Sequence, residues 1–329
     1  MLGVVILNFN TFQYTVQCVE SVRLSDDIPD SLRIYIVDGC STDGSYERLK
    51  DYASKLRDER IVIIQADKNG GFSYGNNYGL RLAVKDGCDN ILCTNSDVVF
   101  NSGAIKIMMN DLLQYKDCAV VGPKVYCDDG TIQNCNVGEL TVFKFIMRKK
   151  PLCFFDFFGI NKKYNYSDYD YSDYLYPTMV SGCCFMIRSD VLEKMHFLDE
   201  DVFLYYEENI LGAKIKTFGM KVMLDPKAEI IHYGGKSTGG NSPFLRYHNY
   251  ISALYFLYHY KHISKFTLHW LAFFMKVNFF IAGLFKKGYW DYIGQIGSRV
   301  THIAKKRKES HNVCNEERNE VVLHKETDE

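Results

Sequence analysis

Gly3-Val4-Val5-Ile6-Leu7-Asn8 and Arg33-Ile34-Tyr35-Ile36-Val37-Asp38 are the two stretches that decide the fold. Each is an apolar run that ends abruptly in a polar residue, which is typical of a strand buried on both faces of a parallel sheet. Between them, residues 11–24 carry valines at helical spacing. A strand, a helix and a second strand in this order predict a parallel βαβ unit.

The same alternation continues outward from this unit. We expect a helix over 45–57, a strand over 61–64, a helix over 74–86, strands over 90–93 and 180–187, a helix over 189–195 and a strand over 228–232. This order predicts an α/β fold with a mainly parallel central sheet flanked by helices. Between 125 and 178 the pattern loosens. The Tyr- and Asp-rich tract 168–174 is either a solvated surface loop or a wall of an acceptor groove.

Polar residues follow the predicted strands at the point where each strand ends. Asn8, Asp38 and Asp97 all occupy such positions. Ligands of open α/β sheets bind at the carboxyl ends of the strands. Asp38 or Asp97 alone is explained better as a turn or helix-cap residue than as a ligand-binding residue. Three in matching positions predict a binding site at this edge of the sheet.

The composition limits the class of protein. The chain has 329 residues, of which 47% are hydrophobic and 24% charged, and its net charge is −1. This length and apolar content suit one large domain, or one domain with an appendage, around a sizeable core. A net charge near zero provides no broad basic field that would recruit nucleic acid. We therefore expect no nucleic-acid partner.

Cysteine usage indicates the compartment. The 11 cysteines show no zinc-ligand spacing, and Cys183 and Cys184 are adjacent in an apolar stretch. Buried free thiols are the expected state, and they indicate a reducing compartment. The apolar run at residues 3–7 lacks a preceding basic region and is too short for a signal peptide, so it is expected to be a strand. These features predict a cytoplasmic protein.

Several motifs in a fixed order resemble a known family. They are Val4-Val5-Ile6-Leu7-Asn8-Phe9-Asn10, Val37-Asp38-Gly39-Cys40-Ser41-Thr42-Asp43-Gly44-Ser45, Asn69-Gly70-Gly71-Phe72-Ser73-Tyr74-Gly75-Asn76-Asn77, Thr94-Asn95-Ser96-Asp97, Phe197-Leu198-Asp199-Glu200 with Phe203-Leu204-Tyr205-Tyr206-Glu207-Glu208, and His232-Tyr233-Gly234-Gly235-Lys236-Ser237. Together they resemble the family 2 inverting glycosyltransferases with the GT-A (nucleotide-diphospho-sugar transferase) fold, and the rhamnosyltransferase-like branch in particular. The resemblance spans residues 3–240.

The resemblance implies a nucleotide-diphospho-sugar donor, either dTDP-rhamnose or a UDP-sugar. It also implies a cell-surface polysaccharide or a lipid-linked saccharide as acceptor. The donor-binding residues that it implies are Asn8, Asn10, Asp38, Asn69, Gly71, Phe72, Asn76, Asn77, Asn95 and Lys236. Asp38 would accept a hydrogen bond from the base or ribose. Lys236 does not end a P-loop, because the glycine that this motif requires is replaced by Ile230.

The metal site implied by the resemblance has fewer carboxylate ligands than is usual in the family. The family's DxD position reads Asn95-Ser96-Asp97, which leaves one carboxylate. Asp97 would hold Mg²⁺ or Mn²⁺, which take oxygen ligands and bridge phosphates. His232 would complete the site, as a His at this late position often does in the family. A structural role for His232 remains the alternative.

The resemblance also implies the catalytic base. Inversion needs a group that removes the proton of the acceptor hydroxyl as it attacks. The family's Glu-Asp pair matches Glu207-Glu208, so Glu208 takes the base position and is one methylene longer than the usual residue. In the alternative interpretation both glutamates only begin a helix, where the positive end of the dipole favours carboxylates.

The remaining third of the chain is expected to be a helical appendage, 241–308, followed by a charged, disordered tail, 309–329. The segment 266–285 is apolar but contains Lys276 near its centre. A central lysine disfavours a spanning helix. We expect an interfacial helix with basic neighbours that contacts the inner face of the plasma membrane. A helix packed on the catalytic domain, or a homodimer interface, is the alternative.

The sequence is thus compatible with two functions. One is inverting glycosyl transfer that uses Mg²⁺ or Mn²⁺. The other is a degenerate GT-A module that binds a nucleotide or a partner without catalysis, which the single carboxylate and the Asp-to-Glu change would explain.

Overall fold

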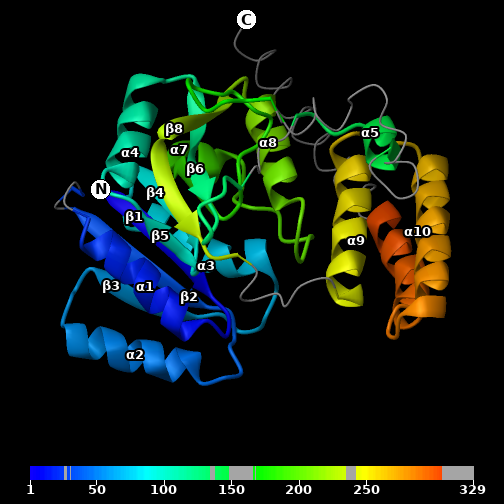
Figure 1. Ribbon diagram of the computed structural model, residues 1–329, viewed down its shortest axis with the longest axis horizontal. Helices are drawn as coiled ribbons and strands as arrows, with labels where there is room; N and C mark the ends of the chain where they lie inside the picture. Colours follow the sequence, from blue (N-terminus) through cyan, green and yellow to red (C-terminus); the bar gives the residue numbers. More distant parts are fainter. Residues whose placement is uncertain are drawn as a thin grey trace, which may run out of the picture. The chain divides into compact units, whose positions relative to one another are not determined.

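The computed structural model describes residues 1–25, 28–29, 31–133, 138–147, 166, 168–234 and 242–305. Two compact units divide the chain, Met1–Gly240 and Asn241–Glu329. The first contains the sheet with its helices, and the second contains helices (Figure 1).

Eight strands and seven helices are defined in the first unit within the described ranges. The strands are β1 (Leu2–Asn8), β2 (Leu32–Asp38), β3 (Ile61–Gln65), β4 (Asn90–Asn95), β5 (Val98–Phe100), β6 (Cys118–Tyr126), β7 (Cys184–Arg188) and β8 (Lys221–His232). The helices are α1 (Phe12–Arg23), α2 (Ser45–Leu56), α3 (Phe72–Lys85), α4 (Ala104–Gln114), α5 (Val142–Met147), α7 (Ser189–Lys194) and α8 (Glu207–Thr217).

The eight strands form one mixed sheet in the order β3-β2-β1-β4-β7-β6-β8-β5. The first four strands are parallel to one another. β7 is antiparallel to both β4 and β6, β6 and β8 are parallel, and β5 is antiparallel to β8. The predicted α/β class, with a largely parallel sheet between helices, is confirmed.

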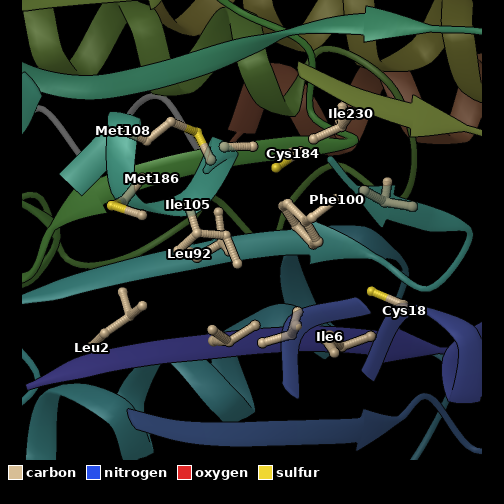
Figure 2. Close-up of a cluster of buried hydrophobic side chains, with 14 of the residues drawn as sticks. Leu2, Ile6, Cys18, Leu92, Phe100, Ile105, Met108, Cys184, Met186 and Ile230 are labelled. Carbon is tan, nitrogen blue, oxygen red and sulfur yellow. The ribbon is translucent and has the colours of Figure 1, made fainter. Parts of the chain in front are cut away.

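The side chains of β1 alternate between two cores. Leu2, Val4 and Ile6 face one hydrophobic cluster, which includes side chains from α1 and α4 (Figure 2). Val5 faces the opposite cluster, where α3, α7 and α8 pack. A strand covered on both faces must be apolar at every position, which explains the unbroken run that begins the sequence. The helices therefore cover both faces and leave the strand ends for polar residues.

The structure differs from the sequence prediction at several elements. The strand expected over 180–187 begins only at Cys184, and the strand expected over 228–232 begins much earlier, at Lys221. The segment Val98–Tyr126, for which no element was predicted, contains β5, α4 and β6. Cys183 and Cys184 are buried and are free thiols, as expected.

The second unit contains α9 (Pro243–His259), α10 (Lys265–Phe285) and a helix over residues 291–305. Ser242 and Ser264 begin the first two helices, and their hydroxyl groups accept hydrogen bonds from Leu245 N and Thr267 N. Such N-caps satisfy backbone N–H groups that have no partner within the helix. The tail predicted over 309–329 lies outside the described residues.

One helix of the described residues, α10, is long and apolar enough to cross a membrane. An 18-residue segment of this helix has a mean hydropathy of 1.5, and 28% of that segment is buried. Length and composition alone do not separate a spanning helix from one that lies on a membrane or packs in a protein.

Candidate active site

Asn8, at the end of β1, is the centre of a buried hydrogen-bond network. Its Nδ2 donates to Asp38 Oδ2 at 2.7 Å and to Ser41 Oγ at 3.1 Å. Its Oδ1 accepts from Thr11 Oγ1 at 3.1 Å and from Thr15 Oγ1 at 2.7 Å. β1 and β2 are in register at Asn8 and Asp38, so the sheet itself brings the two side chains together. The network locks the ends of both strands to α1.

The loop after β2 is fixed by the same network. Asp38 Oδ1 accepts from Ser41 N at 2.9 Å, and Ser41 Oγ accepts from Asn10 N at 2.9 Å. Asn10 Oδ1 in turn accepts from Thr42 N at 2.8 Å. Asn8 and Asp38 are fully buried, whereas Asn10 is exposed. Asp38 therefore holds the shape of the loop, and Asn10 and Thr42 form its accessible rim.

Asp97 and His232 lie side by side, as the interpretation of a shared site requires. Residues 98 and 232 are paired between β5 and β8, and the His232 Nε2 atom is 3.3 Å from Asp97 Oδ1. The other ring nitrogen, Nδ1, is 2.8 Å from Gln133 Oε1. Only 6% of the Asp97 side chain and 10% of the His232 side chain are exposed. Gln133 was not identified from the sequence, because a lone glutamine in a loop has no distinguishing pattern.

The donor atoms of Asp97 and His232 suit a divalent metal ion whose remaining coordination positions are filled by substrate phosphates and water. The described residues contain no group of three or more His, Cys, Asp and Glu side chains that could hold a metal. Asp97 and His232 offer two ligands, a carboxylate oxygen and an imidazole nitrogen. Mg²⁺ commonly takes one or two carboxylates and completes its shell with water and substrate phosphates. These two side chains would supply the protein ligands of such a site, and the described residues contain no complete set of metal ligands.

A glycine joins the 69–72 segment to the segment before α8. Gly71 has φ +90°, and a Cβ at this position would overlap the carbonyl oxygen of Phe203. Phe72 N donates to that same oxygen at 3.0 Å. Asn69 Oδ1 accepts from Gly71 N at 3.2 Å. A residue with a side chain would be strained here by its φ and would also break this contact.

Asn76 and Asn77 of α3 are buried and bind the protein itself. Asn77 Nδ2 donates to Leu198 O at 2.9 Å and to Glu200 Oε1 at 2.7 Å, and its Oδ1 accepts from Leu198 N at 3.1 Å. Asn76 Nδ2 donates to Phe72 O at 3.0 Å. Both side chains therefore position α3 and its neighbouring loop, and neither has an exposed surface.

Glu207 and Glu208 begin α8 after a strained stretch of backbone. Tyr205 and Tyr206 both have φ +69°, which is uncommon for residues other than glycine. Glu208 Oε1 accepts from Gly182 N at 3.1 Å. Glu207 is buried, and its Oε2 atom has no hydrogen-bond partner among the described residues. Strain of this kind persists only where the surroundings impose it, and it is common at active sites.

The same environment changes the acidity of both glutamates. Burial raises the pKa of Glu208, although the N–H of Gly182 and the backbone at the start of α8 favour its charged form. Burial and the nearby Glu208 charge raise the pKa of Glu207 well above its ordinary value. Two adjacent carboxyl groups in an apolar setting do not both ionise readily. The rise is the larger for Glu207, so the pair favours a single charge and Glu207 is the carboxyl group more readily kept neutral.

The end of β4, which leads to Asp97, and the segment that holds Glu208 meet at Cys183. Asn95 N, at the end of β4, donates to Cys183 O at 2.8 Å, and Gly182 next to it holds Glu208. Glu208 and the β4 end that leads to Asp97 are therefore linked through one short segment. Of the residues predicted for the site, only Lys236 lies outside the described residues.

The family model described as glycosyl transferase family 2 matches residues 3–195. This is more than half of the chain. The chain belongs to glycosyl transferase family 2. The matched segment of this family 2 chain includes Asn8, Asp38 and Asp97, whereas Glu207, Glu208 and His232 lie beyond its end.

This family 2 chain is similar to several curated transferases. It is 26% identical over 150 residues to the low-salt glycan biosynthesis hexosyltransferase Agl10 of Haloferax volcanii, covering 45% of this chain and 44% of that protein. It is 24% identical over 196 residues to the dTDP-rhamnosyl transferase RfbF of Shigella flexneri, covering 58% and 57%. The chain thus spans about half the length of the curated relatives it matches.

Solved glycosyltransferases are among the structures with a similar fold. The mannosyltransferase PcManGT from Pyrobaculum calidifontis, in complex with GDP-Man and Mn²⁺, has a TM-score of 0.54 and 14% identity, covering 93% of this chain and 86% of that one. GalNAc-T7 with UDP, GalNAc and Mn²⁺ has a TM-score of 0.53 and 14% identity, covering 78% and 50%. At these identities the likeness concerns the fold, and it confirms the predicted GT-A fold.

Proposed function

We propose that this protein is an inverting glycosyltransferase. It takes a sugar from a nucleotide-diphospho-sugar, dTDP-rhamnose or a UDP-sugar, and transfers it to a cell-surface polysaccharide or a lipid-linked saccharide. Membership of glycosyl transferase family 2 supports the general activity, and the similarity to a protein named as a dTDP-rhamnosyl transferase supports the choice of donor. The observation that carries the proposal is the Glu207–Glu208 pair, with Glu207 buried and Glu208 half-buried, linked through residues 182–183 to the end of β4.

We assign the catalytic domain to residues 1–240 and treat 241–308 as its helical appendage. In the donor site, Asn10 and the backbone of the 69–72 segment are the accessible groups, and Lys236 is the cation assigned to phosphate. The buried Asn8, Asp38, Asn76 and Asn77 act mainly by fixing these loops. Asn95 joins the donor site to the Glu208 segment.

Asp97 and His232 are the residues that would hold Mg²⁺ or Mn²⁺, with the diphosphate supplying the remaining ligands. The ion would neutralise the negative charge that develops on the leaving diphosphate. Gln133 fixes the orientation of His232, as partners of metal-ligating histidines usually do.

Glu208 is the general base of the proposed reaction. The acceptor hydroxyl gives its proton to the Glu208 carboxylate while its oxygen forms a bond to the anomeric carbon. The bond from that carbon to the diphosphate oxygen breaks on the opposite face, which inverts the configuration, and the nucleoside diphosphate leaves. A raised pKa makes Glu208 a better proton acceptor than an ordinary exposed glutamate.

Glu207 supports the base by staying protonated. It then places a neutral group beside Glu208, so that the pair carries a single charge. Two carboxyl groups whose environments separate their roles are a recurrent arrangement in acid–base catalysis.

The second candidate is a GT-A module that binds a nucleotide-sugar without transferring it. The single carboxylate at Asn95-Ser96-Asp97 favours this candidate. A test is to incubate the protein with a panel of nucleotide-sugars, with and without Mn²⁺, and to measure thermal shift and donor turnover. Shift without turnover on any donor or acceptor would favour the binding module.

Glu208→Gln decides whether Glu208 is the base. The amide keeps the shape of the side chain but cannot take a proton, so turnover should fall about 100-fold or more while the donor-induced thermal shift survives. Glu193→Gln, an exposed glutamate on α7, is the matched control and should keep full turnover. Unchanged turnover in Glu208→Gln would remove Glu208 from this role.

The free, buried thiols of Cys183 and Cys184 support the proposal that the protein works in the cytoplasm.

A further inference from the structure

One side of α10 exposes a continuous row of large apolar side chains. The row, here called the aromatic stripe, consists of Phe266, Trp270, Phe273, Val277, Phe280 and Leu284. These side chains are between 37% and 79% exposed. Their spacing alternates between four and three residues, so they lie on one face along the whole helix. Contiguous apolar patches of this kind on a protein surface mark an interaction site.

The opposite side of the same helix is already occupied. Leu268, Leu271, Ala272, Met275 and Phe279 of α10 are buried. Within the unit, Phe279 contacts Tyr250 of α9 and Tyr289, with ring centroids 6.1 Å and 5.3 Å apart. The helix is therefore apolar on both sides for two different reasons. One side packs on its own chain, whereas the side chains of the aromatic stripe remain exposed within the described residues of this unit.

Trp290 extends the aromatic stripe beyond the helix. Its Nε1 donates to Phe280 O at 3.2 Å, and its ring stacks on the Phe280 ring at 6.2 Å with an interplanar angle of 19°. A Cβ at Gly283 would overlap the indole, so the absence of a side chain there lets the ring lie against the helix. More than half of the Trp290 side chain remains exposed. The indole is therefore positioned as an amphipathic group at the edge of an apolar surface, a common place for Trp at membrane interfaces.

The unit that bears the aromatic stripe is strongly basic. Residues 242–305 include eight Lys and Arg residues and one acidic residue, Asp291, although the whole chain has a net charge of −1. Lys265 precedes the stripe, and Lys286 and Lys287 follow it; all three are exposed. In the described part of the chain, none of these three lysines has an ion-pair partner. Their charge is available to an anionic surface.

We propose that the aromatic stripe binds the surface of a phospholipid bilayer that contains anionic lipids, with α10 lying in the plane of the membrane. An exposed apolar face with cations at both ends has the chemistry of such interfacial helices. Basic residues near a bilayer are attracted by its negative surface potential. This contact goes beyond the proposed glycosyl transfer and does not depend on it.

Charge argues against a second copy of this chain as the occupant. Pairing the stripe with itself would bring two basic units together, and like charges oppose such contact. A spanning arrangement is disfavoured by Lys276 near the middle of α10. Its Nζ is 3.1 Å from the place where a Cβ on Gly297 would lie, so it is held beside the helix over 291–305 and away from the helix ends. A cation at the depth of the hydrocarbon core is unfavourable.

The test is flotation of the full chain with extruded vesicles. The wild-type protein should float with vesicles of equal parts phosphatidylcholine and phosphatidylglycerol, and much less with phosphatidylcholine alone. Phe273→Ser with Phe280→Ser should lower the partition coefficient about tenfold or more, because two aromatic side chains no longer enter the interface. Lys286→Glu with Lys287→Glu should lower binding to the anionic vesicles only.

Phe218→Ser is the matched control, since Phe218 is an exposed aromatic residue of the other unit. It should float as the wild type does. Circular dichroism and thermal melting should show that the variant with Phe273→Ser and Phe280→Ser, here called the stripe variant, is folded, as expected for exposed positions. Absence of wild-type flotation, or equal flotation of the stripe variant, would overturn the proposal.

The other occupants give distinct results. Interfacial binding should weaken in about 1 M salt, where the Debye length is about 3 Å. Retention through that salt and an alkaline carbonate wash would instead show a spanning helix. A dimer in solution without vesicles that Phe273→Ser with Phe280→Ser converts to a monomer would assign the stripe to a second copy. Either result would overturn the proposal.

Discussion

Gly182 lies where any side chain would collide with the candidate base. A Cβ at this position would overlap the Glu208 carboxylate, and the Gly182 N–H donates to that carboxylate. The glycine thus has a double role, in which it leaves space for the base and holds it by hydrogen bonding. This role could not be found from the sequence, because Gly182 is separated from Glu208 by a strand and a helix.

Gly182→Ala should therefore displace the Glu208 carboxylate and lower kcat about 10- to 100-fold, as misplacement of a catalytic group by about 1 Å can do. Donor affinity should change much less than kcat, since the atoms that a Cβ on Gly182 would displace are those of the Glu208 side chain. Steady-state kinetics and a donor titration separate the two effects. Gly294→Ala, where a Cβ meets nothing within 4 Å, is the control. Full activity in Gly182→Ala would mean that Glu208 does not depend on this contact.

The acidity of the glutamate pair predicts the pH profile. Because the proposed base must be ionised and burial raises its pKa, kcat/KM should fall as the pH drops through a value above 4.5, the ordinary pKa of a glutamate. Glu207→Gln should leave this acid limb in place, because the residue is already neutral. A downward move of the limb in Glu207→Gln would show instead that Glu207 carries a charge that acts on Glu208.

Among the elements, α4 and β8 meet through a second pair of acids that has no part in the proposed reaction. Asp111 of α4 and Asp225 of β8 are both buried. Burial, and then the Asp225 charge and a hydrogen bond with Asp225, raise the pKa of Asp111 to about 7. Near neutral pH the pair holds a proton that an unfolded chain would release. Its contribution to stability is therefore present at low pH and is lost as the pH rises through about 7.

Asp111→Asn should stabilise the protein selectively at alkaline pH. The amide is neutral at every pH, so the ionisation penalty of the wild-type pair disappears. At pH 8 the variant should melt higher relative to wild type than at pH 5, with each 1 kcal/mol of stability worth about 2–4 °C. Thermal melting across this range measures the difference. A gap between variant and wild type that does not change with pH would show that Asp111 is ionised throughout.

At the scale of elements, sequence periodicity predicted the first half of the sheet well. β1, β2, β3 and the helices between them begin and end within about two residues of the expected positions, because long apolar runs and amphipathic helices give strong local signals. β5 has only three residues, and β7 is antiparallel between neighbours that are distant in sequence. Such short or non-local pairings leave no periodic pattern.

At the scale of the whole molecule, the candidate site also combines residues that a sequence pattern predicts with groups that leave no such pattern. The positions of Asn8, Asp38 and Asp97 after predicted strands placed all three at one edge of the sheet, because parallel strands bring their carboxyl ends to the same edge. Gln133 and the carbonyl oxygen of Phe203 could not be found in this way. The first comes from an irregular loop, and the second is a backbone atom that carries no sequence information.

The whole molecule also combines two differently charged units under a net charge of −1. The basic residues of 242–305 are balanced by an acidic excess elsewhere in the chain. The net charge of −1 is therefore the sum of a basic segment, residues 242–305, and an acidic remainder.

The contact between Gly71 and Phe203 has a consequence for enzyme engineering. Gly71 and Phe72 meet the Phe203 carbonyl oxygen, and Asn77 is bonded to Leu198 and Glu200. Residues 69–77 and 198–204 thus form one exchangeable cassette, although a long stretch of chain separates them. A chimera that imports only the first segment from a relative with another donor preference would inherit a mismatched partner. Both segments have to be transplanted together.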